Sequence, residues 1–221
     1  MDITFMDGSL LMWLQENLQA EWLTPVMKVI TLFGEDGLFW IAVCLLLVIF
    51  RRTRRLGIIC ALSLAFSFLC CNLVIKPLVD RARPWEMFKG VMVLMPDPGD
   101  ASFPSGHTTN AIAPAWAMLL ASTPARSGGR NGNKGTYQDV PCLGWNGIGA
   151  DPRIMHRFAV CAVILAALIG LSRLYLGMHY PTDVMCGFLL GMICATAVFS
   201  LIRRFELRHG LIGTCHLPEQ R

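Results

Sequence analysis

Residues 56–75 read LGIICALSLAFSFLCCNLVI and carry no charged side chain. A helix of about 20 apolar residues is long enough to cross the hydrocarbon core of a bilayer. A second run of similar length and character, VMCGFLLGMICATAVFSLI, occupies residues 184–202. These two stretches predict an integral membrane protein built from helices.

The composition of the whole chain agrees with this prediction. Of 221 residues, 54% are hydrophobic and 15% are charged, the mean hydropathy is +0.52 and the formal net charge is +4. Soluble domains average about 25% charged residues, so these values exclude a disordered chain and argue against an ordinary soluble protein. The length fits one helix bundle. Most of the nine cysteines lie in apolar runs and none forms a C-x-x-C pair, so we expect neither a disulfide framework nor a zinc site.

Three shorter charge-free runs, residues 38–50, 108–125 and 158–172, bring the predicted number of spans to five. Ahead of them, residues 9–33 repeat apolar side chains at helical spacing, and the helix is expected to restart at Thr24-Pro25. We interpret this segment as an amphipathic helix in the membrane interface, with a sixth, irregular span as the alternative. The predicted fold class is an all-α polytopic membrane helix bundle.

The domain organisation follows from these runs. Residues 1–36 form the predicted N-terminal amphipathic segment, residues 37–205 the membrane domain and residues 206–221 a cytoplasmic tail. Within the membrane domain, a stretch rich in glycine and asparagine indicates a flexible insertion at about residues 123–155.

The distribution of basic residues predicts the orientation. When five spans are threaded, three basic clusters fall on the same side of the membrane, which the positive-inside rule assigns to the cytoplasm. The clusters are Arg51, Arg52, Arg54 and Arg55; Arg126, Arg130, Lys134, Arg153 and Arg157; and Arg203, Arg204 and Arg208. Residues 76–106 and 173–183 then lie outside, and we expect a multi-pass protein of the plasma membrane.

Three polar clusters lie in these outer segments, each next to the end of a span. They read KPLVDRARP at residues 76–84, SFPSGHT at residues 102–108 and SRLYLGMHYPTD at residues 172–183. Taken singly, a basic residue here could be an interfacial anchor and a serine could be a helix cap. The concentration of all three clusters on one membrane face favours a functional site.

The residue types suit a phosphoryl group. Lys76, Arg83 and Arg173 can neutralise phosphate oxygens, the arginines through two parallel hydrogen bonds and the lysine as a point charge. Ser105 is a good N-cap residue, and Gly106 lets a ligand approach the free N–H groups at the start of a helix. We therefore expect an anion site at this position.

The histidines supply the expected chemistry. Pro181 predicts a helix start, which places Asp183 in the first turn, close enough to orient the imidazole of His179. An imidazole backed by a carboxylate follows the general arrangement of an activated nucleophile. The second histidine, His107, can protonate a leaving oxygen.

These residues resemble the three-part signature of the phosphatidic-acid phosphatase type 2 family. The matching parts are Lys76 and Arg83-Pro84 separated by six residues, the run from Pro104 to His107, and Ser172-Arg173 followed by His179 and Asp183. The match extends over residues 76–191. The resemblance implies a phospho-histidine on His179, Asp183 orienting it, His107 as acid and then base, and phosphate held by Lys76, Arg83, Arg173, Ser105 and Gly106. It also implies catalysis without a metal ion or other cofactor.

The position of the site at the ends of spans argues for a lipid substrate. We expect a lipid phosphate and membrane lipids as partners, and no nucleic acid. Undecaprenyl diphosphate is favoured, with phosphatidylglycerol phosphate, phosphatidate and phosphorylated lipid A as alternatives. A lipid phosphotransferase would use the same site, and a non-catalytic lipid-phosphate binder is a further alternative.

Overall fold

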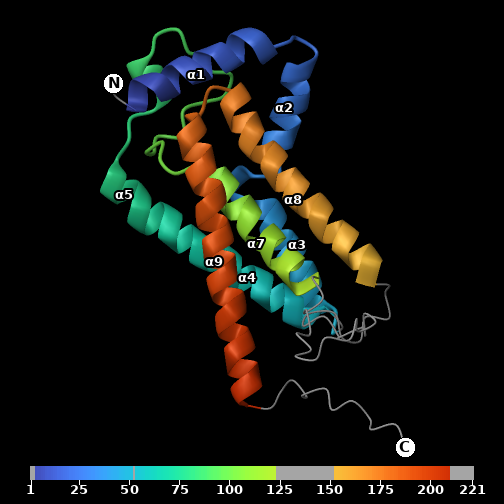
Figure 1. Cartoon of the computed structure of the whole chain (residues 1–221). Coiled ribbons are helices and arrows are strands. Elements are labelled where there is room, and N and C mark those ends of the chain that lie inside the picture. Colours follow the sequence, from blue (N-terminus) through green and yellow to red (C-terminus); the bar gives the residue numbers. More distant parts are fainter. Residues whose placement is uncertain (1–2, 52, 123–151, 210–221) are drawn as a thin grey trace, which may run out of the picture.

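The computed structural model describes residues 3–51, 53–122 and 152–209, and every regular element in these ranges is a helix (Figure 1). In chain order they are α1 (Ile3–Leu18), α2 (Leu23–Leu32), the 3₁₀ turn η1 (Glu35–Gly37), α3 (Leu38–Ile49), α4 (Arg54–Phe68), the π-helical segment η2 (Leu69–Ile75), α5 (Lys76–Val79), α6 (Pro84–Met87), α7 (Gly106–Ser122), α8 (Pro152–Tyr175) and α9 (Pro181–Arg208). The all-helical prediction is confirmed.

Three helical stretches in the described part of the chain are long and apolar enough to cross a membrane: Arg54–Met87, Ile154–Tyr175 and Pro181–Glu206. The predicted spans at 56–75, 158–172 and 184–202 lie within them. The other two predicted spans correspond to α3 and α7, which are apolar but have 12 and 17 residues. The membrane character is therefore supported, while the count of five spans stays a prediction.

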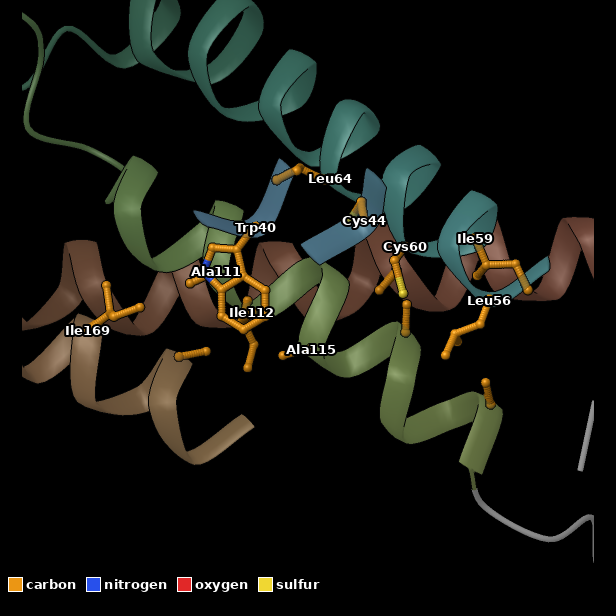
Figure 2. Packing of buried hydrophobic residues seen from close by; sticks show 14 residues of the cluster. Trp40, Cys44, Leu56, Ile59, Cys60, Leu64, Ala111, Ile112, Ala115 and Ile169 are labelled. Carbon is orange, nitrogen blue, oxygen red and sulfur yellow. The ribbon is translucent and has the colours of Figure 1, made fainter. Parts of the chain in front are cut away.

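Helix α7 lies at the centre of the bundle, in contact with α4, α8 and α9. Its buried face is made largely of small side chains, among them Ala111 and Ala115, with Ile112 between them (Figure 2). Trp40 of α3 and Ile169 of α8 belong to the same buried cluster. Small residues let helix backbones approach closely, so α7 can be enclosed on several sides. This enclosure fixes the position of its N-terminus.

The contact between α7 and α9 is close enough to require glycine. A Cβ atom at Gly191 would lie 2.0 Å from Cγ2 of Ile112 and 2.8 Å from the carbonyl oxygen of Thr109. Neither distance is tolerated between non-bonded atoms without movement of the helices. The relative position of α7 and α9 is thus set by direct backbone approach.

The two ends of the bundle differ in character. At one end, Arg55 near the start of α4 forms an ion pair with Glu206 near the end of α9, and Ser122 Oγ lies 3.2 Å from His156 Nδ1. At the opposite end, α1 lies across the ends of α8 and α9, while α2 turns down beside α8 (Figure 1). The basic residues of α4 and α9 and the three polar clusters therefore lie at opposite ends, as the threading predicts.

The expected restart of the N-terminal helix, with Thr24 as cap and Pro25 as first helical residue, is wrong by two residues in position and wrong in the role of the threonine. Helix α2 begins at Leu23, and the N-cap residue is Trp22, without a side-chain cap. Thr24 Oγ1 instead donates to the carbonyl of Ala20 at 3.1 Å and lies 2.9 Å from the hydroxyl of Tyr175. The hydroxyl of Thr24, which local sequence rules assign to capping, is thus used in a contact with Tyr175 of α8.

Most of the predicted insertion at about residues 123–155 lies outside the described residues. Its last four residues do not form a loop, because α8 already begins at Pro152. Proline is favoured in the first turn of a helix, where its missing N–H group has no partner to lose.

Candidate active site

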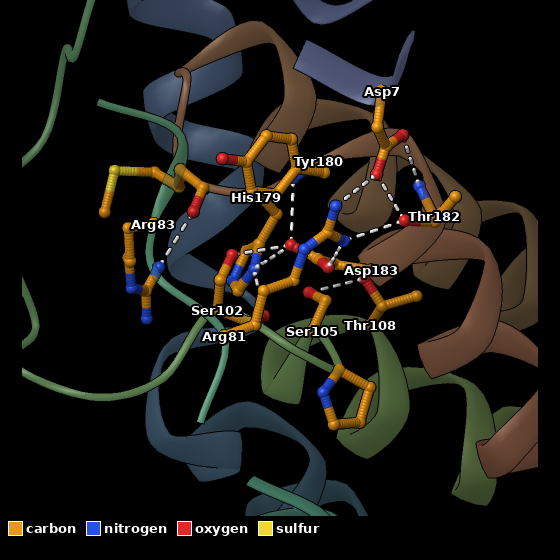
Figure 3. Close-up of polar contacts among 12 residues, drawn as sticks. Asp7, Arg81, Arg83, Ser102, Ser105, Thr108, His179, Tyr180, Thr182 and Asp183 are labelled. Carbon is orange, nitrogen blue, oxygen red and sulfur yellow. Dashed lines mark hydrogen bonds and ion pairs between the residues drawn. The ribbon is translucent and has the colours of Figure 1, made fainter. Parts of the chain in front are cut away.

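The three polar clusters, which are far apart in the sequence, meet at the end of the bundle covered by α1. Main-chain contacts join them: Ser102 N donates to the carbonyl of Arg81 at 2.8 Å, and Ser105 N donates to the carbonyl of Asp183 at 3.1 Å. Arg83 Nη1 donates to the carbonyl of Met178 at 2.8 Å. The structure therefore brings all three sequence-predicted clusters into one site (Figure 3).

Lys76 lies beside the N-terminus of α7. The π-helical segment η2 ends at Ile75, and Lys76 begins α5 with a buried side chain. A Cβ atom at Gly106 would lie 3.8 Å from Lys76 Nζ and 3.3 Å from Asn72 Oδ1. The absence of a side chain at Gly106 thus leaves the first turn of α7 open toward an ammonium group, an arrangement that suits an anion.

Asp100, to which the sequence analysis assigned no role, lies between two of the predicted phosphate ligands. Its carboxylate forms ion pairs with Lys76 and with Arg83, and its carbonyl accepts from Arg83 Nε at 2.9 Å. Partial burial alone would raise the pKa of Asp100, but the hydrogen bonds and charges of Lys76 and Arg83 outweigh it and hold that pKa below its usual value. An anionic group therefore already occupies the space between these two cations.

Two buried nitrogen atoms at the site have no hydrogen-bond partner among the described residues: Nε of Arg173 and Nε2 of His107. Arg173 comes from the last turn of α8, and its Nη1 donates to Thr31 Oγ1 of α2 at 3.0 Å. His107 packs against the turn after α2, where a Cβ atom at Gly34 would lie 3.0 Å from its Cδ2. Because buried polar atoms are normally paired, these two are available to a ligand.

The hydrogen bond of His179 fixes its tautomer. Its Nδ1 lies 2.8 Å from the carbonyl oxygen of Ser102. A carbonyl only accepts, so Nδ1 carries the proton and, in the neutral ring, Nε2 carries the lone pair. Complete burial, together with the positive charges of Arg83 and Arg173, lowers the pKa of His179 well below its usual value. The imidazole is thus a neutral base with its free lone pair on Nε2.

Asp183 contacts this histidine less directly than the sequence suggests. Its Oδ2 lies 3.6 Å from His179 Nδ1, beyond hydrogen-bond distance. The same oxygen accepts from Ser102 Oγ at 2.6 Å and from the main-chain N–H of Tyr180 at 2.9 Å. The carboxylate therefore fixes Ser102, whose carbonyl in turn holds the imidazole.

Ser105 directly precedes the first residue of α7, as the sequence predicts. Its carbonyl accepts from Thr109 N at 3.0 Å, and its hydroxyl accepts from Thr108 Oγ1 at 2.9 Å. The side chain is thus engaged with a neighbouring hydroxyl at the helix start.

Sequence reasoning also missed Arg81 and Asp7. Arg81 Nη1 donates to Asp183 Oδ1 at 2.6 Å, and Arg81 Nη2 donates to Asp7 Oδ2 at 2.9 Å (Figure 3). A signal existed for Asp7, because it precedes Leu11 by four residues and so places a carboxylate on the apolar stripe of the N-terminal helix. Arg81 lies within the quoted first cluster but outside the family signature.

The family model of the PAP2 superfamily matches residues 56–206, which is more than half of the chain. The chain belongs to the PAP2 superfamily. The resemblance read from the three clusters is therefore confirmed.

Among the relatives of this PAP2 protein is an undecaprenyl-diphosphatase of Sulfolobus acidocaldarius, 30% identical over 78% of this chain and 68% of the relative. Phosphatidylglycerophosphatase B of Bacillus subtilis is 26% identical over 86% of this chain and 78% of its own length. The crystal structure of a transmembrane PAP2-type phosphatidylglycerolphosphate phosphatase from Bacillus subtilis aligns with a TM-score of 0.64 at 26% identity, covering 91% of this chain and 87% of that one.

These relatives fix the general class of the protein. It is a multi-pass membrane protein and a hydrolase of the lipid-phosphatase class. Among the described residues, no group of three or more His, Cys, Asp or Glu side chains is arranged to hold a metal ion.

Proposed function

We propose that this PAP2 protein removes the terminal phosphate of a lipid phosphate or lipid diphosphate through a phospho-histidine on His179, without a metal ion. The observation that carries this proposal is a neutral imidazole, with its lone pair on Nε2, buried among three basic side chains at a helix N-terminus.

The substrate phosphate would bind where the cations converge. Lys76, Arg83 and Arg173 neutralise its oxygens, and Arg173 Nε supplies a buried donor that has no partner among the described residues. Ser105 and the open backbone at Gly106 add the N-terminal end of α7. To bind in this way, the phosphate displaces the carboxylate of Asp100 from Lys76 and Arg83.

In the first step, Nε2 of His179 attacks phosphorus. Burial and the charge of Arg173 lower the pKa of His107 to about 2, so His107 gains its proton together with the negatively charged substrate phosphate, which offsets those cations. The Nε2–P bond forms as the bond to the leaving oxygen breaks, and the protonated His107 gives its proton to that oxygen. The imidazole becomes positively charged while Nδ1 keeps its hydrogen bond to Ser102. Asp183, 3.6 Å from Nδ1, stabilises this charge.

In the second step, His107 accepts a proton from water as the water oxygen attacks phosphorus. The Nε2–P bond breaks, inorganic phosphate forms and the neutral imidazole of His179 returns. His107 ends protonated, as it began, so the cycle is balanced. A lipid or sugar hydroxyl in place of water would give the phosphotransferase alternative.

We propose that the site faces the extracytoplasmic side of the plasma membrane. The basic residues at the other end of α4 and α9 support this orientation under the positive-inside rule. A headgroup could then enter at the outer surface while its apolar chains stay in the bilayer.

Undecaprenyl diphosphate is our first choice of substrate, and phosphatidylglycerol phosphate and phosphatidate are the alternatives. The names of two relatives, an undecaprenyl-diphosphatase and phosphatidylglycerophosphatase B, support the first two of these.

The test is phosphate release by detergent-purified protein from these three lipids in the presence of a chelator, with His179→Gln as the inactive control. Release by the wild type alone is expected, and the relative rates identify the lipid. Adding acceptor alcohols separates hydrolysis from transfer, because a transferase passes the phosphate to them. No release from any lipid by folded protein would contradict the proposal and favour a non-catalytic lipid-phosphate binder.

A further inference from the structure

We propose that Asp7 of the N-terminal helix α1 is a positioning residue for catalysis, acting on Asp183 through Arg81. This inference rests on the proposed function. It assigns part of the active site to a segment outside the matched family region, residues 56–206.

The inference starts from the guanidinium of Arg81, which joins two carboxylates. Nη1 donates to Asp183 Oδ1 at 2.6 Å and to Thr182 Oγ1 at 2.8 Å, and Nη2 donates to Asp7 Oδ2 at 2.9 Å. Its Cζ lies 4.0 Å from the centre of the Tyr180 ring. The side chains of Asp183, Asp7 and Arg81 are 0%, 3% and 15% exposed, so solvent screens this network weakly.

Asp7 also contacts the start of α9 directly. Its Oδ1 accepts from the main-chain N–H of Thr182 at 3.1 Å, and its Oδ2 accepts from the hydroxyl of the same residue. The first N–H groups of a helix have no partner within it, and a negative charge is favourable there. A carboxylate from α1 thus stabilises the helix end that carries Asp183.

The network leads from α1 to the reacting imidazole in four contacts. Asp7 fixes Arg81, Arg81 fixes Asp183, Asp183 accepts from Ser102 Oγ at 2.6 Å, and the Ser102 carbonyl holds His179 Nδ1 at 2.8 Å (Figure 3). The main-chain carbonyl of Arg81 also accepts from Ser102 N. Each contact restricts the next, so the orientation of His179 depends on a residue that never touches substrate.

The charges of the network also indicate that Asp7 supports catalysis. Two carboxylates and one guanidinium leave one net negative charge beside His179, which becomes positively charged in the phospho-enzyme. Without Asp7 that net charge is lost, and Nη2 of Arg81 loses its carboxylate partner. Both effects slow formation of the phospho-histidine, while Lys76, Arg83 and Arg173 still bind phosphate.

The way α1 packs is consistent with a role in holding Asp7. Its face toward the bundle carries Asp7, Leu11 and Gln15, one turn apart, and all three are buried. Gln15 Nε2 donates to the carbonyl of Met92 at 2.8 Å, which holds the other end of the helix. Trp13, by contrast, is exposed on the outer face.

The experiment is a double-mutant cycle with Asp7→Asn, Arg81→Gln and both together, measured as kcat, KM and the inhibition constant of inorganic phosphate. We expect each single variant to lose about tenfold or more in kcat with little change in phosphate inhibition, and the double variant to lose clearly less than the product of the two single losses. Glu16→Gln, an exposed acid on the same helix, is the matched control and should behave as wild type.

A merely structural role for Asp7 would weaken phosphate inhibition and lower kcat together, and would overturn the inference. So would an unchanged kcat in Asp7→Asn, or effects that multiply in the double variant. If the wild type is active and the variants give one of these contradicting results, this inference alone is overturned. A wild type that releases no phosphate would overturn the proposed function as well.

Discussion

Replacing Asp100 with asparagine should tighten the binding of inorganic phosphate. In the structure its carboxylate forms ion pairs with Lys76 and Arg83, two of the groups that we assign to the substrate phosphate. Substrate and Asp100 therefore compete for the same cations. Asparagine keeps the size of the side chain and removes its charge, so the competition weakens while the loop keeps its shape.

The magnitude follows from the exposure of this carboxylate. Its side chain is 44% exposed, so the pairs resemble surface ion pairs, which contribute about 0.2–1 kcal/mol each. Two such pairs give about 1 kcal/mol, which corresponds to roughly fivefold in an equilibrium constant. The inhibition constant of inorganic phosphate should fall by about this factor in Asp100→Asn.

The assay is inhibition of radiolabelled phosphate release from a lipid substrate by unlabelled inorganic phosphate. Asp97→Asn is the matched control, because Asp97 lies on the same loop. Among the described residues, its carboxylate accepts a hydrogen bond only from the N–H of Gly99, at 2.8 Å. An inhibition constant that rises or stays the same in Asp100→Asn would refute the reasoning.

Three further predictions concern packing, charge and pH. Gly191→Ala should lower stability by about 1–3 kcal/mol, because the added Cβ meets Ile112, and thermal unfolding in detergent measures it; an unchanged midpoint would contradict the packing. Arg173→Lys should reduce kcat/KM by about tenfold with unchanged helicity, because a point charge replaces a fork of donors, and kinetics at wild-type level would remove Arg173 from the phosphate site. Because the pKa of His179 is lowered in the folded state, the stability that its neutral form contributes is complete above about pH 6.5 and is lost as the pH falls. The midpoint of thermal unfolding should therefore fall less on acidification in His179→Gln than in the wild type. An equal fall of the midpoint in both proteins would count against a neutral buried imidazole.

The sequence predicted the central part of the site because its residues lie at the ends of apolar runs. Lys76 follows the run at 56–75, His107 precedes the run at 108–125, and Asp183 precedes the run at 184–202. Because consecutive spans cross the membrane in opposite directions, these ends meet at one surface. The alternation of apolar and polar segments was therefore enough to predict the fold class and the clusters that form the candidate site.

The contacts of Asp7 and Asp100 could not be predicted in the same way. Asp7 lies 74 residues from Arg81 in the sequence, and its pairing depends on how α1 crosses the ends of α8 and α9. The place of Asp7 on the apolar stripe of its helix indicates that it faces the bundle, but not which cation it meets there. Asp100 presents the same difficulty, because its charge is paired only once the loop before α7 has folded back onto Lys76.

The ends of helices are also hard to predict from apolar runs. Apolar runs placed the spans, but α9 continues from the predicted Ile202 to Arg208, because arginine is compatible with a helix although not with the bilayer core. The hydropathy of the sequence indicates where a span leaves the bilayer core. The helix itself continues until its backbone hydrogen bonds end.

The central claim is the covalent intermediate on His179, and trapping it is the most direct test. Wild type and His179→Gln would be mixed with a lipid diphosphate labelled in its terminal phosphate, quenched in base within the first turnover and digested for mass spectrometry. We predict an acid-labile phosphoryl group on the peptide containing His179, and none in the variant. Full turnover without a labelled peptide, or label on another residue, would contradict the account.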